Sequence, residues 1–182
     1  MNARHTCQLT QVFAIFVICS FMGFVVAAQV KPTPDIHYVP TPPQIVDAML
    51  KLARLGEGDV VYDLGSGDGR IVIAAARQAG VRGVGIELDA GLIRVARAEA
   101  LKARVSDKVT FSQSDLFATD LSEATVVTLY LSPSVNLRLR AKLQRELRPG
   151  TRIVSHRFPI GDWTPDEDVV VGGTHVYSWT IR

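Results

Sequence analysis

Cysteine is nearly absent from this chain. Its 182 residues include only Cys7 and Cys19, and both fall in an apolar stretch near the N-terminus. The rest of the sequence therefore has no thiol nucleophile, disulfide or cysteine-built metal site. The four histidines, at positions 5, 37, 156 and 175, are scattered without the spacing of metal ligands. We accordingly predict that the protein binds no metal.

A strong excess of charge is missing as well. The 20 basic and 18 acidic residues give a formal net charge of +2, which lacks the basic footprint typical of nucleic-acid-binding proteins. Nucleic acid is therefore an unfavoured partner. The sequence also has no internal repeat and no low-complexity tract. Its length and its 47% of hydrophobic residues suffice for one folded domain with a sizeable core.

Charged side chains are absent between Thr6 and Val30, and residues 12–28 are almost continuously apolar. Two interpretations are open. Val26 and Ala28, as small residues at positions −3 and −1 of a cleavage site, are typical of a signal peptide, whereas about 20 apolar residues can also anchor a chain in a membrane. We predict a membrane-associated or exported protein and leave the side of the membrane open. The chain then divides into a signal peptide or anchor (1–30), a proline-rich linker (31–43) and a folded domain (44–182).

Helical and strand patterns alternate along residues 44–182. Apolar spacing and capping residues predict helices at 44–55, 71–79, 90–103 and 133–147. β-forming runs predict strands at 60–64, 83–87, 109–112, 124–131 and 152–158, then a hairpin of strands 168–171 and 175–181. This order predicts an α/β fold with a mostly parallel sheet, helices on both faces and a C-terminal antiparallel hairpin. Ligands of such sheets bind at the carboxyl ends of the strands.

Three glycines follow the first strand at alternate positions. Gly65, Gly67 and Gly69 allow a tight turn and let a ligand approach the backbone closely. Asp63 places a carboxylate beside this turn, which suits a cationic ligand better than a phosphate. A dinucleotide-binding turn needs its third glycine five positions after the first, where this chain has Arg70. A nicotinamide dinucleotide is therefore disfavoured.

Two further acids follow the next two strands. Glu87 comes 22 residues after Gly65, where a carboxylate can bind the two hydroxyl groups of a ribose. Asp115 follows the third strand, where its carboxylate can accept from an adenine amino group while Leu116 covers the ring. The alternatives are an ordinary strand–turn–helix and a plain loop aspartate. Asp63 and these two acids should converge at one edge of the sheet, a pattern that resembles the S-adenosylmethionine site of Rossmann-like class I methyltransferases.

Methyl transfer from a sulfonium is an in-line displacement, so the protein chiefly has to align donor and acceptor. Tyr130, at the end of the fourth strand, and His156, in the fifth, are the candidate catalytic residues. Core packing is the alternative for Tyr130, and a hydrogen-bonded structural role is the alternative for His156. Phe158 and Trp163 either wall an acceptor channel or belong to the core. The chain lacks the Asn-Pro-Pro-Tyr sequence common after the fourth strand of adenine and glutamine methyltransferases, which disfavours those acceptors.

Positive charge is concentrated on and just after the helix predicted at 133–147. Its members are Arg138, Arg140, Lys142, Arg145 and Arg148. Such a helix can contact anionic lipid or an acidic partner. A solvated helix face is the favoured interpretation.

Four stretches of the sequence resemble the small membrane-associated lysine methyltransferases that modify the ATP synthase c subunit and the adenine nucleotide translocase. They are Tyr38–Pro42, Asp63–Val72, Gly85–Glu87 and Arg157–Asp166, of which the last is the most particular. The resemblance implies S-adenosyl-L-methionine as the cofactor. It also implies lysine methylation of a protein substrate, with a membrane protein as a candidate.

The resemblance also implies roles for individual residues. Tyr38, Pro40 and Thr41 would fold over the donor, Glu87 would bind its ribose, and Asp115, with Leu116 beside it, would hold its adenine. The methionine part of the donor would lie against the segment that contains Asp63, Gly65, Ser66, Gly67 and Gly69. Two alternatives stay open: a methyltransferase of a small molecule or lipid, and a non-catalytic module that binds S-adenosylmethionine.

Overall fold

The computed structural model describes residues 38–182. The predicted signal peptide or anchor, and the linker up to residue 37, lie outside the described residues, so the proposed division of the chain stays a prediction. Within residues 38–182, no helix is long and apolar enough to cross a membrane.

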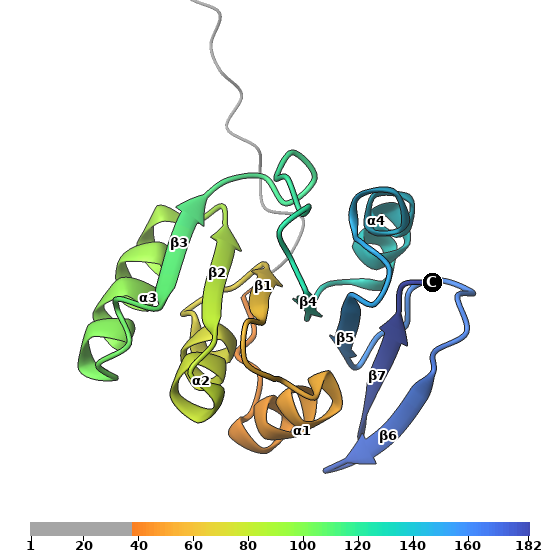
Figure 1. Ribbon diagram of the computed structural model, residues 1–182, viewed down its shortest axis with the longest axis horizontal. Coiled ribbons are helices and arrows are strands. Elements are labelled where there is room, and N and C mark those ends of the chain that lie inside the picture. Colours follow the sequence, from red (N-terminus) through yellow and green to blue (C-terminus); the bar gives the residue numbers. More distant parts are fainter. Residues whose placement is uncertain (1–37) are drawn as a thin grey trace, which may run out of the picture. The chain divides into compact units, whose positions relative to one another are not determined.

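A seven-stranded sheet organises the described part of the chain, in the order β3-β2-β1-β4-β5-β7-β6 (Figure 1). The first five strands are parallel, and β7 and β6 add an antiparallel hairpin. The strands are β1 (Val60–Leu64), β2 (Arg82–Glu87), β3 (Val109–Gln113), β4 (Val126–Leu129), β5 (Arg152–His156), β6 (Glu167–Val171) and β7 (Thr174–Thr180). The helices are α1 (Pro43–Ala53), α2 (Arg70–Ala79), α3 (Ala90–Lys102) and α4 (Pro133–Glu146). The predicted fold class is confirmed.

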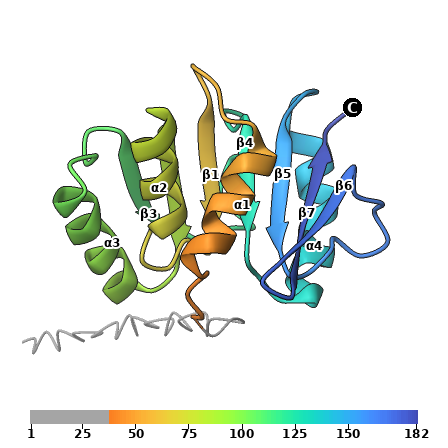
Figure 2. The ribbon, with the colours of Figure 1, turned by 90° about the horizontal axis from the view of Figure 1, so that it is seen from below.

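Two apolar clusters form the core, one on each face of the sheet. Alternating strand residues such as Val61, Val126 and Val154 pack under α1, α2 and α3. The other alternating set, which includes Leu64 and Leu129, packs on the opposite face with α4 and the loop before β4. Figure 2 shows α1 to α3 in front of the sheet and α4 behind it. The period of two along each strand explains this division, because successive side chains point to opposite faces.

The fourth and fifth strands end earlier than predicted. We expected strands at 124–131 and 152–158, whereas β4 ends at Leu129 and β5 at His156. After β5 the backbone turns sharply, because Arg157 has a left-handed φ of 70° and the Phe158 N–H donates to the His156 carbonyl at 2.8 Å. Strand propensity continues through these residues, but the turn that lets the chain leave the sheet overrides it.

Arg152 joins the C-terminal end of α1 to the amino-terminal edge of the sheet. Arg152, the first residue of β5, pairs with Asp59 and also donates to the carbonyls of Ala53 and Arg54, at 2.8 Å each. Asp59 in turn accepts from the Thr125 hydroxyl at 2.6 Å. One guanidinium therefore satisfies carbonyls at the C-terminal end of α1 that have no partner within the helix.

Removing this guanidinium should destabilise the fold. The side chains of Arg152 and Asp59 are only 23% and 11% exposed, so Arg152→Met leaves a shielded carboxylate and two carbonyls without their donor. We expect a loss of roughly 2–4 kcal/mol in the free energy of unfolding, measured with urea on the full chain in detergent. Arg82→Met is the matched control, because the Arg82–Glu123 pair is exposed and should contribute at most about 1 kcal/mol. Equal losses in the two variants would contradict this account.

Candidate functional site

The register of the parallel strands places the candidate residues in one row. Asp63 pairs with Gly85 of β2 and with Thr128 of β4, and Thr128 pairs with Val154 of β5. Two residues further along, the chain reaches the carboxyl edge of the sheet, where Glu87 and His156 end β2 and β5 and where Gly65 and Tyr130 lie just past the ends of β1 and β4. The residues at these next positions are, in order across the sheet, Glu87, Gly65, Tyr130 and His156.

The turn between β1 and α2 has neither the backbone conformation nor the space for side chains at its three glycines. Gly65, Gly67 and Gly69 all have left-handed φ values, of 80°, 54° and 78°. A Cβ on Gly67 would collide with the ring of Tyr38, and a Cβ on Gly69 would lie 2.5 Å from Phe111. Glycine is therefore needed here both for conformation and for space.

Glu87 holds this turn against β2. Its Oε2 accepts from the Gly67 N–H at 2.9 Å, and its Oε1 accepts from the N–H groups of Leu88 and Asp89, at 2.7 and 2.9 Å. The turn is also tied to β2 through the Ile86 carbonyl, which accepts from the backbone N–H groups of Gly65 and Ser66. The carboxylate predicted to bind a ribose is thus fixed in place by the backbone around it.

Asp63 is buried beneath the turn, with 2% of its surface exposed. Its Oδ1 accepts from the Thr128 hydroxyl at 2.8 Å. Burial raises the pKa of its carboxyl to about 7, and the negative charges of Glu87 and Asp68 act in the same direction. A carboxyl held in this way gains a favourable partner when a cation comes close.

The end of the linker crosses the glycine turn. The ring of Tyr38 lies against Gly67, and Arg70 Nη1 donates to the Thr41 carbonyl at 2.8 Å. Arg70 is itself held by an ion pair of 2.6 Å with Asp68. Tyr38 and Thr41 therefore lie at the turn, as expected, with Pro40 on the segment that joins them. The clamp that Arg70 provides was not predicted; its only signal in the sequence is its place where a dinucleotide turn has glycine.

Asp115 and Leu116 follow β3 next to Glu87, whose carbonyl accepts from the Ser114 N–H at 3.1 Å. The Asp115 side chain is exposed, and its Oδ1 accepts from the Phe117 N–H at 2.8 Å. Leu116 is buried in the cluster on the α4 face. Asp115 thus lies at the predicted edge of the sheet. Its bond to the Phe117 N–H is also the contact that an ordinary loop aspartate makes in a turn.

Tyr130 and His156 meet at the ends of β4 and β5. Their ring centroids are 3.9 Å apart, and the ring planes are inclined by 36°. His156 is buried, and this burial, followed by the charge of Arg157, lowers the pKa of its imidazole to about 4. The two candidate catalytic residues therefore lie together beside Gly65.

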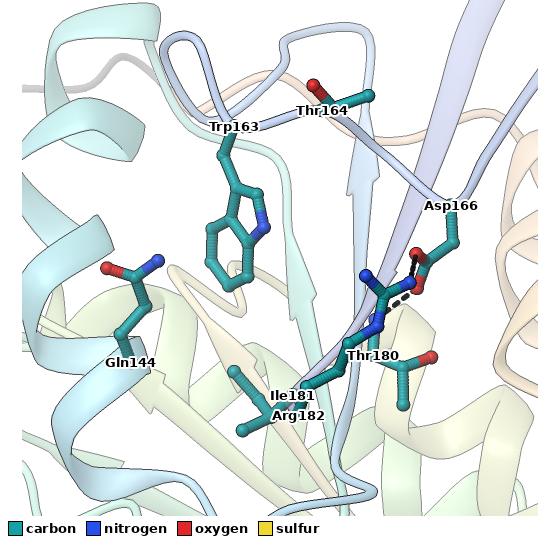
Figure 3. Close-up of a pocket in the computed structure, with 7 residues that line it drawn as sticks. All are labelled: Gln144, Trp163, Thr164, Asp166, Thr180, Ile181 and Arg182. Carbon is teal, nitrogen blue, oxygen red and sulfur yellow. Dashed lines mark hydrogen bonds and ion pairs between the residues drawn. The ribbon is translucent and has the colours of Figure 1, made fainter.

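The structure separates Trp163 from this pair. Trp163 lines a pocket of about 300 Å³, and Figure 3 shows its ring between Gln144 and the end of β7. Thr180, which also lines the pocket, pairs with Arg152 at the start of β5, whereas His156 is the last residue of that strand. The pocket therefore belongs to the opposite edge of the sheet. Of the two alternatives for Trp163, the structure supports the core, because its ring packs against the cluster on the α4 face, and not the acceptor channel.

The cations of α4 are largely paired within the chain. Arg140 pairs with Asp162, and Lys142 and Arg145 both pair with Glu146. Arg138 lies over the ring of Phe117, with 4.2 Å between its Cζ and the ring centroid. Arg145 agrees with the solvated helix face that we favoured, since its side chain is 67% exposed, whereas Lys142 is buried and departs from it. Among residues 38–182 no group of three or more His, Cys, Asp or Glu side chains could hold a metal ion.

Solved structures with the same fold carry the reaction product of S-adenosylmethionine. The chain is 60% identical to an RNA methyltransferase from Salinibacter ruber in complex with S-adenosyl-L-homocysteine, with a TM-score of 0.77 over 79% of this chain and 94% of that one. It is 28% identical to a SAM-dependent methyltransferase from Geobacter sulfurreducens, with a TM-score of 0.55 over 66% and 51% of the two chains. The fold and the site thus define a class I methyltransferase that uses S-adenosylmethionine.

The family follows from sequence comparison. A family model described as the ANTKMT methyltransferase domain matches residues 63–167. The chain is 46% identical over 139 residues to a protein-lysine N-methyltransferase from Saccharolobus islandicus, covering 76% of this chain and 86% of the relative. The chain belongs to this ANTKMT methyltransferase family, which confirms the predicted resemblance.

Mammalian relatives are longer than this chain. The mouse lysine N-methyltransferase named for the adenine nucleotide translocase is 40% identical over 149 residues, and the human one named for the c subunit of ATP synthase is 39% identical over 144. These matches cover 81% and 79% of this chain but only 64% and 61% of the two mammalian proteins.

Asp63 should make stability depend on pH. Its pKa is raised from 3.8 to about 7, so between these values the folded chain holds a proton that the unfolded chain has released. The free energy of unfolding of the wild type should therefore fall, relative to Asp63→Asn, by up to about 1.4 kcal/mol per unit as the pH rises from 4 to 7. Urea unfolding of both chains without ligand measures this difference. Exposed Asp107→Asn is the control, and a constant gap between Asp63→Asn and wild type would refute the assignment.

Proposed function

We propose that this protein transfers methyl groups from S-adenosylmethionine to a lysine side chain of a protein. The observation that carries the proposal is the 46% identity to a protein-lysine N-methyltransferase over 86% of that relative. Relatives from mouse and human are also named for lysine methylation. The name of the Salinibacter ruber protein favours RNA as a second candidate acceptor.

The row at the carboxyl edge would hold the donor with its ribose at Glu87. That carboxylate accepts three backbone hydrogen bonds, and since two carboxylate oxygens offer about four acceptor sites, about one is left for a ribose hydroxyl. The methionine part would lie over Gly65, Ser66, Gly67 and Gly69. Ser66 Oγ supports this, because it is buried and has no partner among the described residues.

Two further segments would hold the adenine of the donor and cover the donor. Asp115 and Leu116 would bind the adenine, since they follow β3 beside Glu87. Tyr38, Pro40 and Thr41 would cover the donor, because the Tyr38 ring already lies on the glycine turn. Burial of the donor under this segment would exclude water from the site.

The spacing of the strands supports transfer near Tyr130. Neighbouring strands lie about 4.8 Å apart, so Tyr130 stands roughly 10 Å from Glu87 across Gly65. S-adenosylmethionine supplies a methyl group on a positively charged sulfur. The Asp63 carboxylate, one row below, would favour that charge, and Tyr130 and His156 would form the side from which the amine approaches.

We further propose that residues 12–28 associate the protein with a membrane, and that its acceptor is a membrane protein. The almost continuous apolar composition of these residues supports the first point. The names of the mouse and human relatives, which refer to a translocase and to a component of ATP synthase, support the second.

Loss of the Glu87 charge should weaken donor binding without unfolding the chain. We expect Glu87→Gln to raise the dissociation constant for S-adenosylhomocysteine about 10- to 100-fold, which corresponds to the loss of one charged hydrogen bond to the ribose. Calorimetry on the full chain in detergent measures this change, and Glu123→Gln, whose side chain is exposed, is the control. An unchanged affinity in Glu87→Gln would remove Glu87 from the donor site.

The acceptor should be identified by transfer of labelled methyl groups. We would incubate the full chain in detergent with tritiated S-adenosylmethionine and, separately, a purified c-ring of ATP synthase, poly-L-lysine, tRNA and lipid vesicles. The expected result is label on the c-ring, with methylated lysine found by mass spectrometry. Label in tRNA or lipid alone would contradict the lysine proposal. Binding of S-adenosylhomocysteine with no transfer to any of these would favour a non-catalytic binding module.

A further inference from the structure

His156 contains a buried nitrogen that has no hydrogen-bond partner. The residue is 4% exposed, and its Nδ1 has no partner among the described residues. An unpaired buried polar atom destabilises a fold, and native proteins rarely keep one without a reason. A purely apolar ring would fill the same space at no such cost. The imidazole therefore calls for an explanation beyond packing.

The backbone after His156 is held in an unusual conformation. Arg157 has a φ of 70°, which a residue with a side chain seldom adopts. Its N–H donates to the His175 carbonyl at 2.7 Å, and the Phe158 N–H donates to the His156 carbonyl. These bonds fix where β5 ends and hence where the imidazole stands. Strained backbone of this kind is concentrated at functional sites.

Tyr130 covers the imidazole. The ring centroids are 3.9 Å apart, and Tyr130 is the partly exposed member of the pair. It occupies the position between Gly65 and His156 in the row at the carboxyl edge.

The imidazole is uncharged at neutral pH. Burial and the neighbouring Arg157 lower its pKa to about 4, and a neutral imidazole has one nitrogen that accepts a hydrogen bond. Such a nitrogen attracts an N–H group without repelling a cation. It is also far too weak a base to take the proton of a lysine ammonium, whose pKa is about 10.4.

We propose that Nδ1 of His156 accepts a hydrogen bond from the acceptor amine and so forms an amine subsite beside the ring of Tyr130. The inference rests on the proposed lysine methylation. The ammonium first loses its proton to water, and His156 then orients the neutral amine with its lone pair towards the methyl carbon. The new C–N bond forms as the C–S bond breaks, the electron pair of that bond stays on sulfur, and the product is a methylated ammonium.

The number of N–H groups on the amine makes this role specific. Neutral lysine has two, monomethyl-lysine has one, and dimethyl-lysine has none. His156 can therefore orient the amine for the first and second transfers but has no hydrogen to accept in the third. A residue that only maintains the fold would affect all three transfers alike.

His156→Phe tests this distinction on the full chain in detergent. The aromatic ring is kept and the unpaired nitrogen is removed, so the melting temperature should rise by about 2–4 °C. Affinity for S-adenosylhomocysteine should stay within about twofold of the wild type. The initial rate should fall at least about tenfold on poly-L-lysine and stay unchanged on poly-L-lysine that has been chemically dimethylated. His175→Phe, the same change at an exposed histidine that pairs with Asp168, is the control and should leave the affinity for S-adenosylhomocysteine and both rates unchanged.

Two results would overturn the inference. One is an unchanged rate of His156→Phe on unmethylated poly-L-lysine, and the other is an equal loss on both forms. A chain without transferase activity is tested by ¹⁵N NMR of its histidines, in complex with S-adenosylhomocysteine, during titration with n-butylamine above pH 10. The Nδ1 resonance of His156 should shift with n-butylamine and not with N,N-dimethylbutylamine; absence of a shift with n-butylamine refutes the subsite. Failure to bind S-adenosylhomocysteine would instead refute the proposed donor site.

Discussion

The pairing of β1 with its two neighbours is the constraint on which the candidate site depends. Asp63 stands level with Gly85 and Thr128, and this register brings Glu87, Gly65 and Tyr130 into one row two residues later. A slip of one residue in β1 would turn Asp63 to the α4 face and Leu64 into its place. Because Val61 and Leu64 are buried in opposite clusters, the apolar core fixes the register and thereby the site.

The carboxyl edge carries polar groups that lower the stability of the unliganded fold. Asp63 is buried with a raised pKa, and Ser66 Oγ and His156 Nδ1 are buried without partners among the described residues. At the opposite edge the partly buried polar groups are paired. Arg152 forms an ion pair with Asp59 and donates hydrogen bonds to the carbonyls at the end of α1. Polar groups left unsatisfied in a well-packed fold are expected where a ligand completes them.

Local patterns in the sequence predicted the elements and the glycine turn, whereas contacts between distant segments were beyond them. A sequence signal of only a few residues predicted each of three features: the strand before Gly65, the helix cap at Asp89 and the C-terminal hairpin. The clamp of Arg70 on the Thr41 carbonyl joins segments 29 residues apart. The place of Trp163 stayed open between acceptor channel and core, because composition cannot tell that the loop after His156 runs back to the opposite edge of the sheet.

Electrostatics bears on the choice between the two named acceptors. Recognition of RNA depends on cations that are available to phosphates. On α4, Arg140 pairs with Asp162, and Lys142 and Arg145 share Glu146, so contact with phosphates would require these pairs to open. A lysine acceptor needs instead a narrow approach to the methyl group beside groups that do not repel a cation. The half-buried Tyr130 and the uncharged His156 are compatible with the amine acceptor that the 46% identity supports, whereas the charge of Arg157, which acts on the imidazole, favours the amine over its ammonium.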